Sequence, residues 1–471
     1  MFARGTFLML IGQASFILSA VVINFGLARL LGPVDFGTFG LVMSVLVAAE
    51  RFVVTGIPEL VQKLGGERPE SMYSLVRKTF PPQLIYTLAV FAVFWFLVPL
   101  VTKSFGDPAL QFFFRLASFD ILFCGVFRYY LGIQNGLHRF GRHALLSVTY
   151  SVVKVATIFG LVFGGFSLMG AVIGNTLGTV GGLVVALWIT RLLKVQREVS
   201  PIPYLQFVVP NVLYFMGLYL FFCVDLWFVK YYLSDATVGY YVSASTLAKA
   251  PYFLSLALSA ALLPSVARAI EEKNTDRTKE LVQESLRYLL MFLLVINVVV
   301  ISTSSSLVVT FFGQVYEEAS SVLSILIVGL SFVTFFAVMN TILMAYNRMR
   351  TVFVITFVLL VLDVLFNGVL VPRFGIEGAA MSTTLVAVMG AVASGCVVFS
   401  ELRTLLPILS ALRMVCAAAV VFFLSFLVPE GGFWNFIKWI GLMGGYFALL
   451  GLMGEINAVE MRRLKNVLSI G

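Results

Sequence analysis

Apolar runs of about 20 residues recur along the whole chain, and they restrict its fold more than any other feature of the sequence. A helix of roughly 20 residues is long enough to cross a hydrocarbon core about 30 Å thick. We predict about fourteen such helices, at residues 6–30, 38–61, 81–102, 110–133, 144–165, 168–190, 204–232, 239–265, 286–312, 320–345, 352–372, 378–400, 408–428 and 434–454. No stretch between them is long enough for a separate soluble domain, so the sequence predicts an all-α polytopic membrane protein.

The composition agrees with this class. Of the 471 residues, 60% are hydrophobic and 12% charged, and the mean hydropathy is +1.00, whereas a soluble domain carries about 25% charged residues. The four cysteines lie inside predicted spans and form no CxxC pair, and the chain has only two histidines. Because structural zinc needs clustered ligands and disulfides need paired cysteines, we expect neither, and no cofactor.

The basic residues predict the orientation. Of the 32 Lys and Arg residues, 21 fall on the side that holds both termini, four on the other side and seven inside spans. Cytoplasmic loops retain positive charge, so we predict a multi-pass plasma (inner) membrane protein with both termini in the cytoplasm. The net charge of +9 then follows from topology and from contact with membrane lipid, and it requires no nucleic-acid partner.

A weak internal repeat predicts the domain organisation. The string GFSLMGAVIGNTL at 165–177 resembles RFGIEGAAMSTTL at 373–385. Six predicted spans separate the two copies, an even number, so both halves face the same way across the membrane. We therefore expect an N-terminal six-helix lobe at 1–200, a second at 201–403, and two extra helices with a cytoplasmic tail at 404–471.

Ionisable residues near the middle of predicted spans are the candidate functional residues. A charge at this depth is costly unless it faces a partner or a wet cavity. Six residues have this position: Glu50, Arg51, Asp120, Lys154, Lys249 and Asp363. Polar residues at helical spacing accompany both lysines, with Ser147, Tyr150, Ser151 and Thr157 beside Lys154, and Tyr241, Ser245 and Tyr252 beside Lys249. Such stripes line a wet path or a helix interface.

The three cations indicate a site for an anionic substrate. Arg51 and Lys249 each lie on the second helix of a predicted lobe, and a cleft between the lobes would bring them face to face. Together with Lys154 they would suit a substrate that carries a diphosphate, because arginine offers a fork and lysine a point charge to phosphate oxygens.

The acids support a different role. Glu50, Asp120 and Asp363, the last with Asn367 one turn away, could bind Na⁺ or carry a proton. The alternative for all of these charges is that they form ion pairs which only hold the helix bundle together.

Three short strings carry a resemblance to a known family. They are ARLLGPVDFGTFGLVMS after the first span, GIQNGLHRFGRHALLSV after the fourth, and LLPSVARAI at the end of the eighth. In this order they resemble the oligosaccharide flippases of the multidrug/oligosaccharidyl-lipid/polysaccharide exporter superfamily, from Ala28 to about Glu401. The resemblance implies two pseudo-symmetric six-helix lobes in a V around a central cavity, followed by two C-terminal helices.

The resemblance also bears on Arg51. The string RFVVTG at 51–56 resembles the second-helix arginine motif of the lipid II flippases, where that arginine faces the cavity, but Thr55 replaces the usual glutamate. The first helix reads INFGLARL and lacks the paired arginine and aspartate of that subfamily. This departure favours an O-antigen, capsule, exopolysaccharide or N-glycan precursor over lipid II.

The function that the resemblance implies is translocation of a polyprenyl-diphosphate-linked oligosaccharide from the cytoplasmic to the outer leaflet. Its partners would be this lipid-linked substrate, membrane lipid, a coupling Na⁺ or H⁺, and polysaccharide assembly proteins. A cation-coupled multidrug antiporter with the same fold is the main alternative. A membrane glycan polymerase or ligase is disfavoured because the predicted outer loops are short and contain no catalytic motif, so we predict a transporter and not an enzyme.

Overall fold

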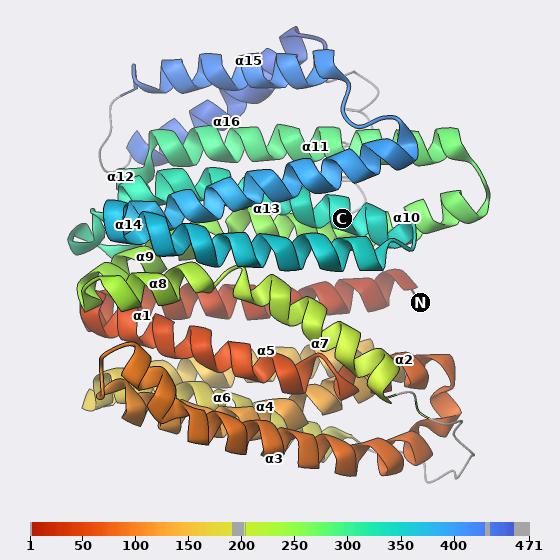
Figure 1. Cartoon of the computed structure of the whole chain (residues 1–471), viewed down its shortest axis with the longest axis vertical. Helices are drawn as coiled ribbons and strands as arrows, with labels where there is room; N and C mark the ends of the chain where they lie inside the picture. The colour runs from red at the N-terminus through yellow and green to blue at the C-terminus, as the bar shows by residue number, and fades with distance from the viewer. Residues whose placement is uncertain (1, 191–201, 203, 429–433, 456–471) are drawn as a thin grey trace. The chain divides into compact units, whose positions relative to one another are not determined.

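The computed structural model describes residues 2–190, 202, 204–428 and 434–455. Over these residues the chain forms helices joined by short connections, with no strand. The predicted all-α class is therefore confirmed. The chain divides into two compact units, unit 1 at 1–242 and unit 2 at 243–471, and the boundary falls inside α9 (Figure 1).

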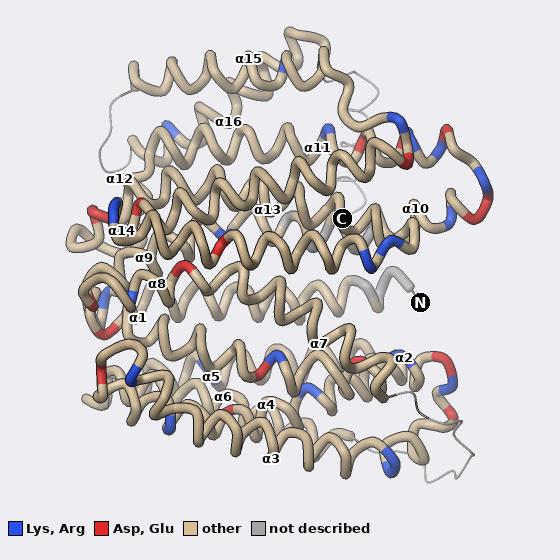
Figure 2. Tube along the Cα trace, viewed as in Figure 1, with Lys and Arg blue, Asp and Glu red and all other residues tan. Residues whose placement is uncertain are grey.

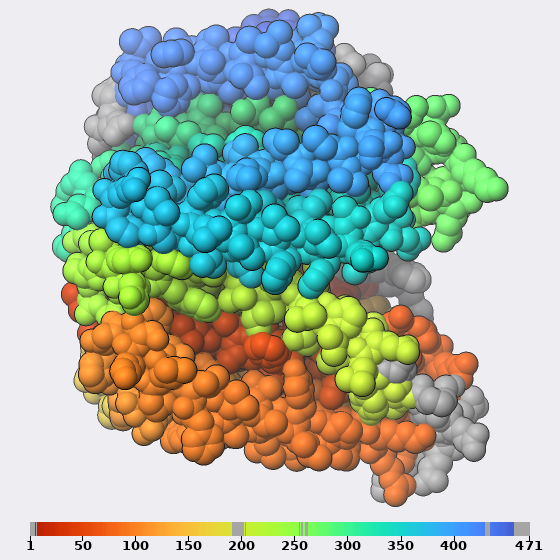
Figure 3. Space-filling view, viewed as in Figure 1, coloured from red at the N-terminus to blue at the C-terminus, as the bar shows by residue number. Residues whose placement is uncertain are grey.

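Unit 1 contains the first eight helices and the beginning of α9. These are α1 (Phe2–Val54), α2 (Ile57–Glu67), α3 (Met72–Ser104), α4 (Leu110–Gly136), α5 (Phe140–Leu161), α6 (Ser167–Ile189), α7 (Tyr204–Leu220), α8 (Val224–Tyr232) and α9 (Asp235–Ala248). On the face of this unit shown in Figure 3, α3 forms a continuous surface, and its exposed side chains are largely apolar, as a lipid-facing helix requires.

Unit 2 contains the remaining helices. These are α10 (Ala250–Glu271), α11 (Thr275–Ser302), α12 (Ser304–Phe312), α13 (Ala319–Ala345), α14 (Met349–Leu402), α15 (Ile408–Ser425) and α16 (Trp434–Leu452). The last two helices pack on α11 through a shared apolar core that includes Val295, Met414 and Tyr446 (Figure 1). Charged residues gather in the connection from α10 to α11 (Figure 2), where they are exposed.

Several helices are long enough for two membrane crossings. In the described part of the chain nine helical segments have the length and hydropathy of a membrane span, or ten if the bent pair α7 and α8 is counted as one more. Three of these segments run for 61, 50 and 54 residues, and each contains two of the predicted spans. All fourteen predicted spans lie on helix along most of their length, so a polytopic membrane protein is confirmed.

The two copies of the predicted repeat each contain a turn with a positive φ angle. In unit 1, the chain reverses at Gly165, whose φ is 90°, and Gly170 then packs against the end of α5, because a Cβ there would lie 3.0 Å from the carbonyl carbon of Leu161. In unit 2, α14 turns at Gly375, whose φ is 61°, and a Cβ on Gly378 would lie 2.2 Å from the carbonyl oxygen of Leu370. Gly375 aligns with Ser167, whose backbone angles are similar (φ 45°, ψ −132°), so the two turns share a positive φ at the same position of the repeat. In each copy a glycine follows where helix backbones touch. The division into lobes at residue 200 stays a prediction.

Candidate functional site

A charged cluster, buried at Asp120 and half-buried at Glu50 and Lys154, joins three helices of unit 1. Glu50 comes from α1, Asp120 from α4 and Lys154 from α5, and the three groups interact electrostatically. Asp120 is 2% exposed. The structure therefore brings together three of the predicted mid-membrane residues. They meet because α5 lies against both α1 and α6, and α4 packs on α6.

Hydrogen bonds fix the orientation of two members of this cluster. Lys154 Nζ donates to the Tyr150 hydroxyl one turn earlier, at 3.0 Å. Asn175 on α6 donates from Nδ2 to Asp120 Oδ2 at 2.7 Å. Among the described residues, Asp120 Oδ1 and Glu50 Oε1 are buried atoms with no hydrogen-bond partner. Two carboxyl groups that face each other with unsatisfied oxygens are a place where a proton can be held.

Close helix packing places Lys154 in this cluster. A Cβ on Gly178 of α6 would lie 2.5 Å from the Lys154 Cβ, and one on Gly174 would lie 2.6 Å from the backbone of Ile158. Only glycines allow α6 to lie this close to α5, and small residues serve helix packing in membranes in this way. The lysine stem is therefore trapped between the two helices.

Arg51 lies outside the cluster, near the end of α1. Its guanidinium carbon is 5.2 Å from the centre of the Tyr219 ring on α7, which is a cation–π distance. The Tyr219 hydroxyl donates to the carbonyl of Ser44 on α1 at 3.0 Å, which fixes the ring. Arg51 Nε is buried and has no hydrogen-bond partner among the described residues. Directly after it the helix breaks at Gly56 (φ −104°, ψ −99°) before α2 begins.

A second polar cluster lies in unit 2. Asp363 and Asn367 on the first half of α14 are fully buried, as is Ser382 on the second half. Asp363 Oδ1 accepts hydrogen bonds from Asn367 Nδ2 at 3.0 Å and from Ser382 Oγ at 3.3 Å. Asn367, one turn from Asp363, thus bonds to its carboxylate, and the turn at Gly375 adds the serine.

Lys249 occupies the junction between α9 and α10. It is half-buried, and its backbone amide donates to the Ser245 carbonyl at 3.2 Å. Lys249 belongs to unit 2 and Arg51 to unit 1, so the expectation that they face each other across a cleft stays a prediction.

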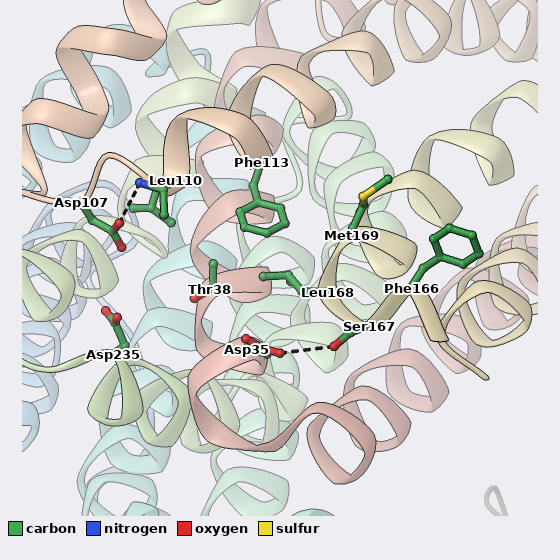
Figure 4. A pocket seen from close by; sticks show the side chains of 11 residues that line it. Asp35, Thr38, Asp107, Leu110, Phe113, Phe166, Ser167, Leu168, Met169 and Asp235 are labelled. Carbon is green, nitrogen blue, oxygen red and sulfur yellow. Dashed lines mark hydrogen bonds between the residues drawn. The ribbon is translucent and has the colours of Figure 1, made fainter. Parts of the chain in front are cut away.

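A pocket of about 450 Å³ opens at the end of unit 1 where α1 turns at Gly32. Carboxylates of Asp35, Asp107 and Asp235 line it together with apolar side chains such as Phe113 and Phe166 (Figure 4). Ser167 donates to Asp35 at 3.3 Å. Hydropathy and motif patterns do not single out these residues, because the segments that hold them lie far apart along the chain.

Comparison with known proteins identifies the family. The sequence model of the family described as polysaccharide biosynthesis protein matches residues 26–321. No curated protein matches the sequence closely enough to count as a relative.

Solved structures with low sequence identity share the fold. The lipid II flippase MurJ, in an inward closed conformation, has a TM-score of 0.76 and 16% identity, covering 94% of this chain and 98% of that chain. An inward-facing multidrug resistance MATE family transporter of the MOP superfamily has a TM-score of 0.70 and 15% identity, covering 84% of this chain and 99% of that chain. A MOP superfamily transporter from Pyrococcus furiosus has a TM-score of 0.58 and 18% identity, covering 85% and 96%.

These findings agree with the resemblance stated from the sequence. At such identities the solved structures establish the fold alone, and it is the fold of MOP superfamily transporters. The family model covers more than half of the 471 residues, and the chain therefore belongs to the polysaccharide biosynthesis protein family.

Proposed function

We propose that the protein is a flippase that moves a polyprenyl-diphosphate-linked oligosaccharide from the cytoplasmic to the outer leaflet of the plasma membrane. The observation that carries this proposal is the family match over residues 26–321, on a fold that the lipid II flippase shares. Polysaccharide is built outside the cell from precursors made inside, and a polytopic helical protein supplies the crossing step. Both termini are then cytoplasmic, and assembly proteins receive the lipid-linked product outside.

Arg51 is the proposed contact for the diphosphate. Its guanidinium rests on the Tyr219 ring, and one of its nitrogens is buried without a partner. A buried donor without an acceptor is costly, and a phosphate oxygen would satisfy it with a charge-assisted bond. Lys249 and Lys154 are the proposed further cations of the cavity, although Lys154 also has a place beside Glu50 and Asp120.

A multidrug antiporter of the same fold is the second candidate. It is favoured by the carboxyl groups of Glu50 and Asp120, which each keep a buried oxygen without a hydrogen-bond partner among the described residues and are suited to bind a cation or a proton. The MATE transporter of similar fold supports it equally. An enzymatic role is not proposed, because the solved structures of similar fold are a flippase and transporters.

Transport of a fluorescent prenyl-diphosphate oligosaccharide in liposomes tests the first proposal. We expect wild-type protein to move the lipid between leaflets and Arg51→Ala to lose most of this activity, about tenfold or more, because one charge-assisted contact is worth roughly 1.5–3 kcal/mol. Arg51→Lys should recover only part, since lysine lacks the fork. The matched control is Arg277→Ala, which removes an exposed arginine paired with Glu280 on α11.

Other outcomes separate the two candidates. If several such lipids fail to move and cationic dyes are extruded instead, the protein is a drug antiporter and Arg51 has a structural role. If Arg51→Ala flips lipid at the wild-type rate, the diphosphate contact lies elsewhere.

The acidic residues are the proposed coupling sites for Na⁺ or H⁺. Asp363 and Asn367 present buried oxygens in unit 2, and Glu50 with Asp120 presents them in unit 1. We expect Asp363→Asn to abolish the response of transport to an imposed Na⁺ or pH gradient while passive flipping continues. The measurement is the initial flipping rate with and without each gradient, with Glu50→Gln tested in parallel. Wild-type transport that ignores both gradients would show a passive flippase, driven by consumption of the substrate outside.

A further inference from the structure

A buried lysine ties three chain segments together at the Gly32 end of unit 1. Lys230 on α8 is 7% exposed, and its Nζ donates to Asp107 Oδ2 at 2.9 Å and to Asp235 Oδ1. Asp107 lies in the connection from α3 to α4, whereas Asp235 begins α9, five residues after the lysine. One ion pair is thus local, and the other crosses to a segment 123 residues away in sequence.

Beside the lysine, helix backbones touch. A Cβ on Gly239 of α9 would lie 2.0 Å from the carbonyl oxygen of Pro33, and one on Gly37 of α1 would lie 2.5 Å from the amide nitrogen of Gly239. No side chain fits between α1 and α9 at this level. Further along α8, Trp227 Nε1 donates to Ser44 Oγ of α1 at 2.9 Å. The end of the unit is therefore sealed by backbone contact as well as by charge.

These contacts explain why the chain up to residue 242 clusters with unit 1. They join α8 and the start of α9 to the rest of this unit at the Gly32 end, through Lys230, Trp227 and Gly239. The charge distribution places this end on the outer side of the membrane.

We propose that Lys230 is a latch that holds the outer end of the protein closed, and that its bond to Asp107 breaks when this end opens. The proposal rests on the proposed transport function, because a flippase must expose its cavity outside at some step. Asp235 belongs to the same connection as Lys230, so it keeps the lysine paired after Asp107 has separated. This arrangement avoids leaving an isolated buried charge, which would make opening prohibitively costly.

The pocket beside the latch fits this role. Asp107 and Asp235 line it together with Asp35, which accepts a hydrogen bond from Ser167 (Figure 4). Water that enters the pocket can solvate the Asp107 carboxylate when the lysine leaves. The latch therefore releases beside a pocket that three carboxylates line.

A cysteine introduced at a buried position can report opening of this end of the protein without any substrate. Val238 on α9 is 1% exposed and lies next to the Gly239 contact. In a background with the four native cysteines replaced by alanine, Val238→Cys should react slowly with a membrane-impermeant maleimide added outside intact cells. Ser234→Cys, at an exposed position of the same connection, is the control reporter and should react fast in every variant.

The two ion pairs predict different results. We expect Lys230→Ala and Asp107→Asn each to raise the labelling rate of Val238→Cys about tenfold, because both remove the crossing bond. Asp235→Asn should change it by less than about twofold, since Lys230 still holds Asp107. The exchanged pair Lys230→Asp with Asp107→Lys keeps every charge at this end and should restore slow labelling.

The latch proposal is contradicted if Val238→Cys reacts equally fast in the wild-type background, in Lys230→Ala and in Asp107→Asn. It is also contradicted if Asp235→Asn raises the labelling rate as much as Asp107→Asn does. A general loss of structure is recognised because the exchanged pair would then fail to restore slow labelling. The assay reads conformation alone, so a protein that flipped none of the tested lipids would fail the proposed function and could still pass this test.

Discussion

Replacing Gly378 with alanine is expected to destabilise the protein by about 3 kcal/mol or more, which is the upper range for overpacking a well-packed site. The added Cβ would lie 2.2 Å from the carbonyl oxygen of Leu370 and 2.6 Å from its carbonyl carbon. Both are backbone atoms, so no side-chain rotation relieves the collision. The two halves of α14 would have to separate at the Gly375 turn, next to the Asp363–Ser382 hydrogen bond.

A control with the same chemical change predicts the opposite sign. Gly441 lies on an exposed face of α16, and a Cβ there meets no atom within 4 Å. Alanine stabilises a helix interior by roughly 0.5–1 kcal/mol relative to glycine, so Gly441→Ala should be neutral or slightly stabilising. Thermal unfolding of both variants in detergent gives the comparison. Equal melting temperatures for the two variants would show that α14 does not make this close turn.

The sequence predicts the placement of helices well, because the length of apolar runs reflects membrane thickness. It does not predict where a helix breaks inside a span. The turn at Gly32 falls in the predicted connection between the spans 6–30 and 38–61, whereas the break at Gly56 falls inside the span 38–61 and depends on backbone angles that hydropathy does not record. The break between α7 and α8, a bend of 47°, is invisible for the same reason, since residues 221–223 are as apolar as their neighbours.

The sequence identifies the single residues of the candidate site, but it does not predict which of them lie together. Depth in the membrane identifies Glu50, Asp120 and Lys154 as unusual, because a charge there is costly wherever it points. Which of them meet depends on helix neighbours and rotation, and a single sequence does not give these. Lys230, by contrast, could not be identified as a site residue from the sequence. It lies near the end of a predicted span and resembles an ordinary outer-loop charge, and its partner Asp107 is too distant in sequence to suggest a pair.

The same arrangement predicts a large loss of stability when the charge of Lys154 is removed. Lys154→Met keeps most of the side-chain volume but leaves the carboxyl groups of Glu50 and Asp120 facing each other without their ammonium group. Removing one partner of a buried charged set typically costs about 3–5 kcal/mol, so we expect a large fall in thermal stability in detergent.

A second substitution should reverse much of this loss. Glu50→Gln removes one of the two carboxylates, and in the Lys154→Met background it leaves Asp120 with Asn175 as a hydrogen-bond donor and no facing negative charge. We therefore expect the double variant Lys154→Met with Glu50→Gln to be more stable than Lys154→Met alone, with a coupling of about 1–3 kcal/mol in a double-mutant cycle. Lys279→Met, on the part of α11 nearest its charged connection, is the control that should show no coupling to Glu50→Gln. If the stability changes of Lys154→Met and Glu50→Gln are strictly additive, Lys154 does not interact with Glu50. The proposed diphosphate role would then explain the lysine better.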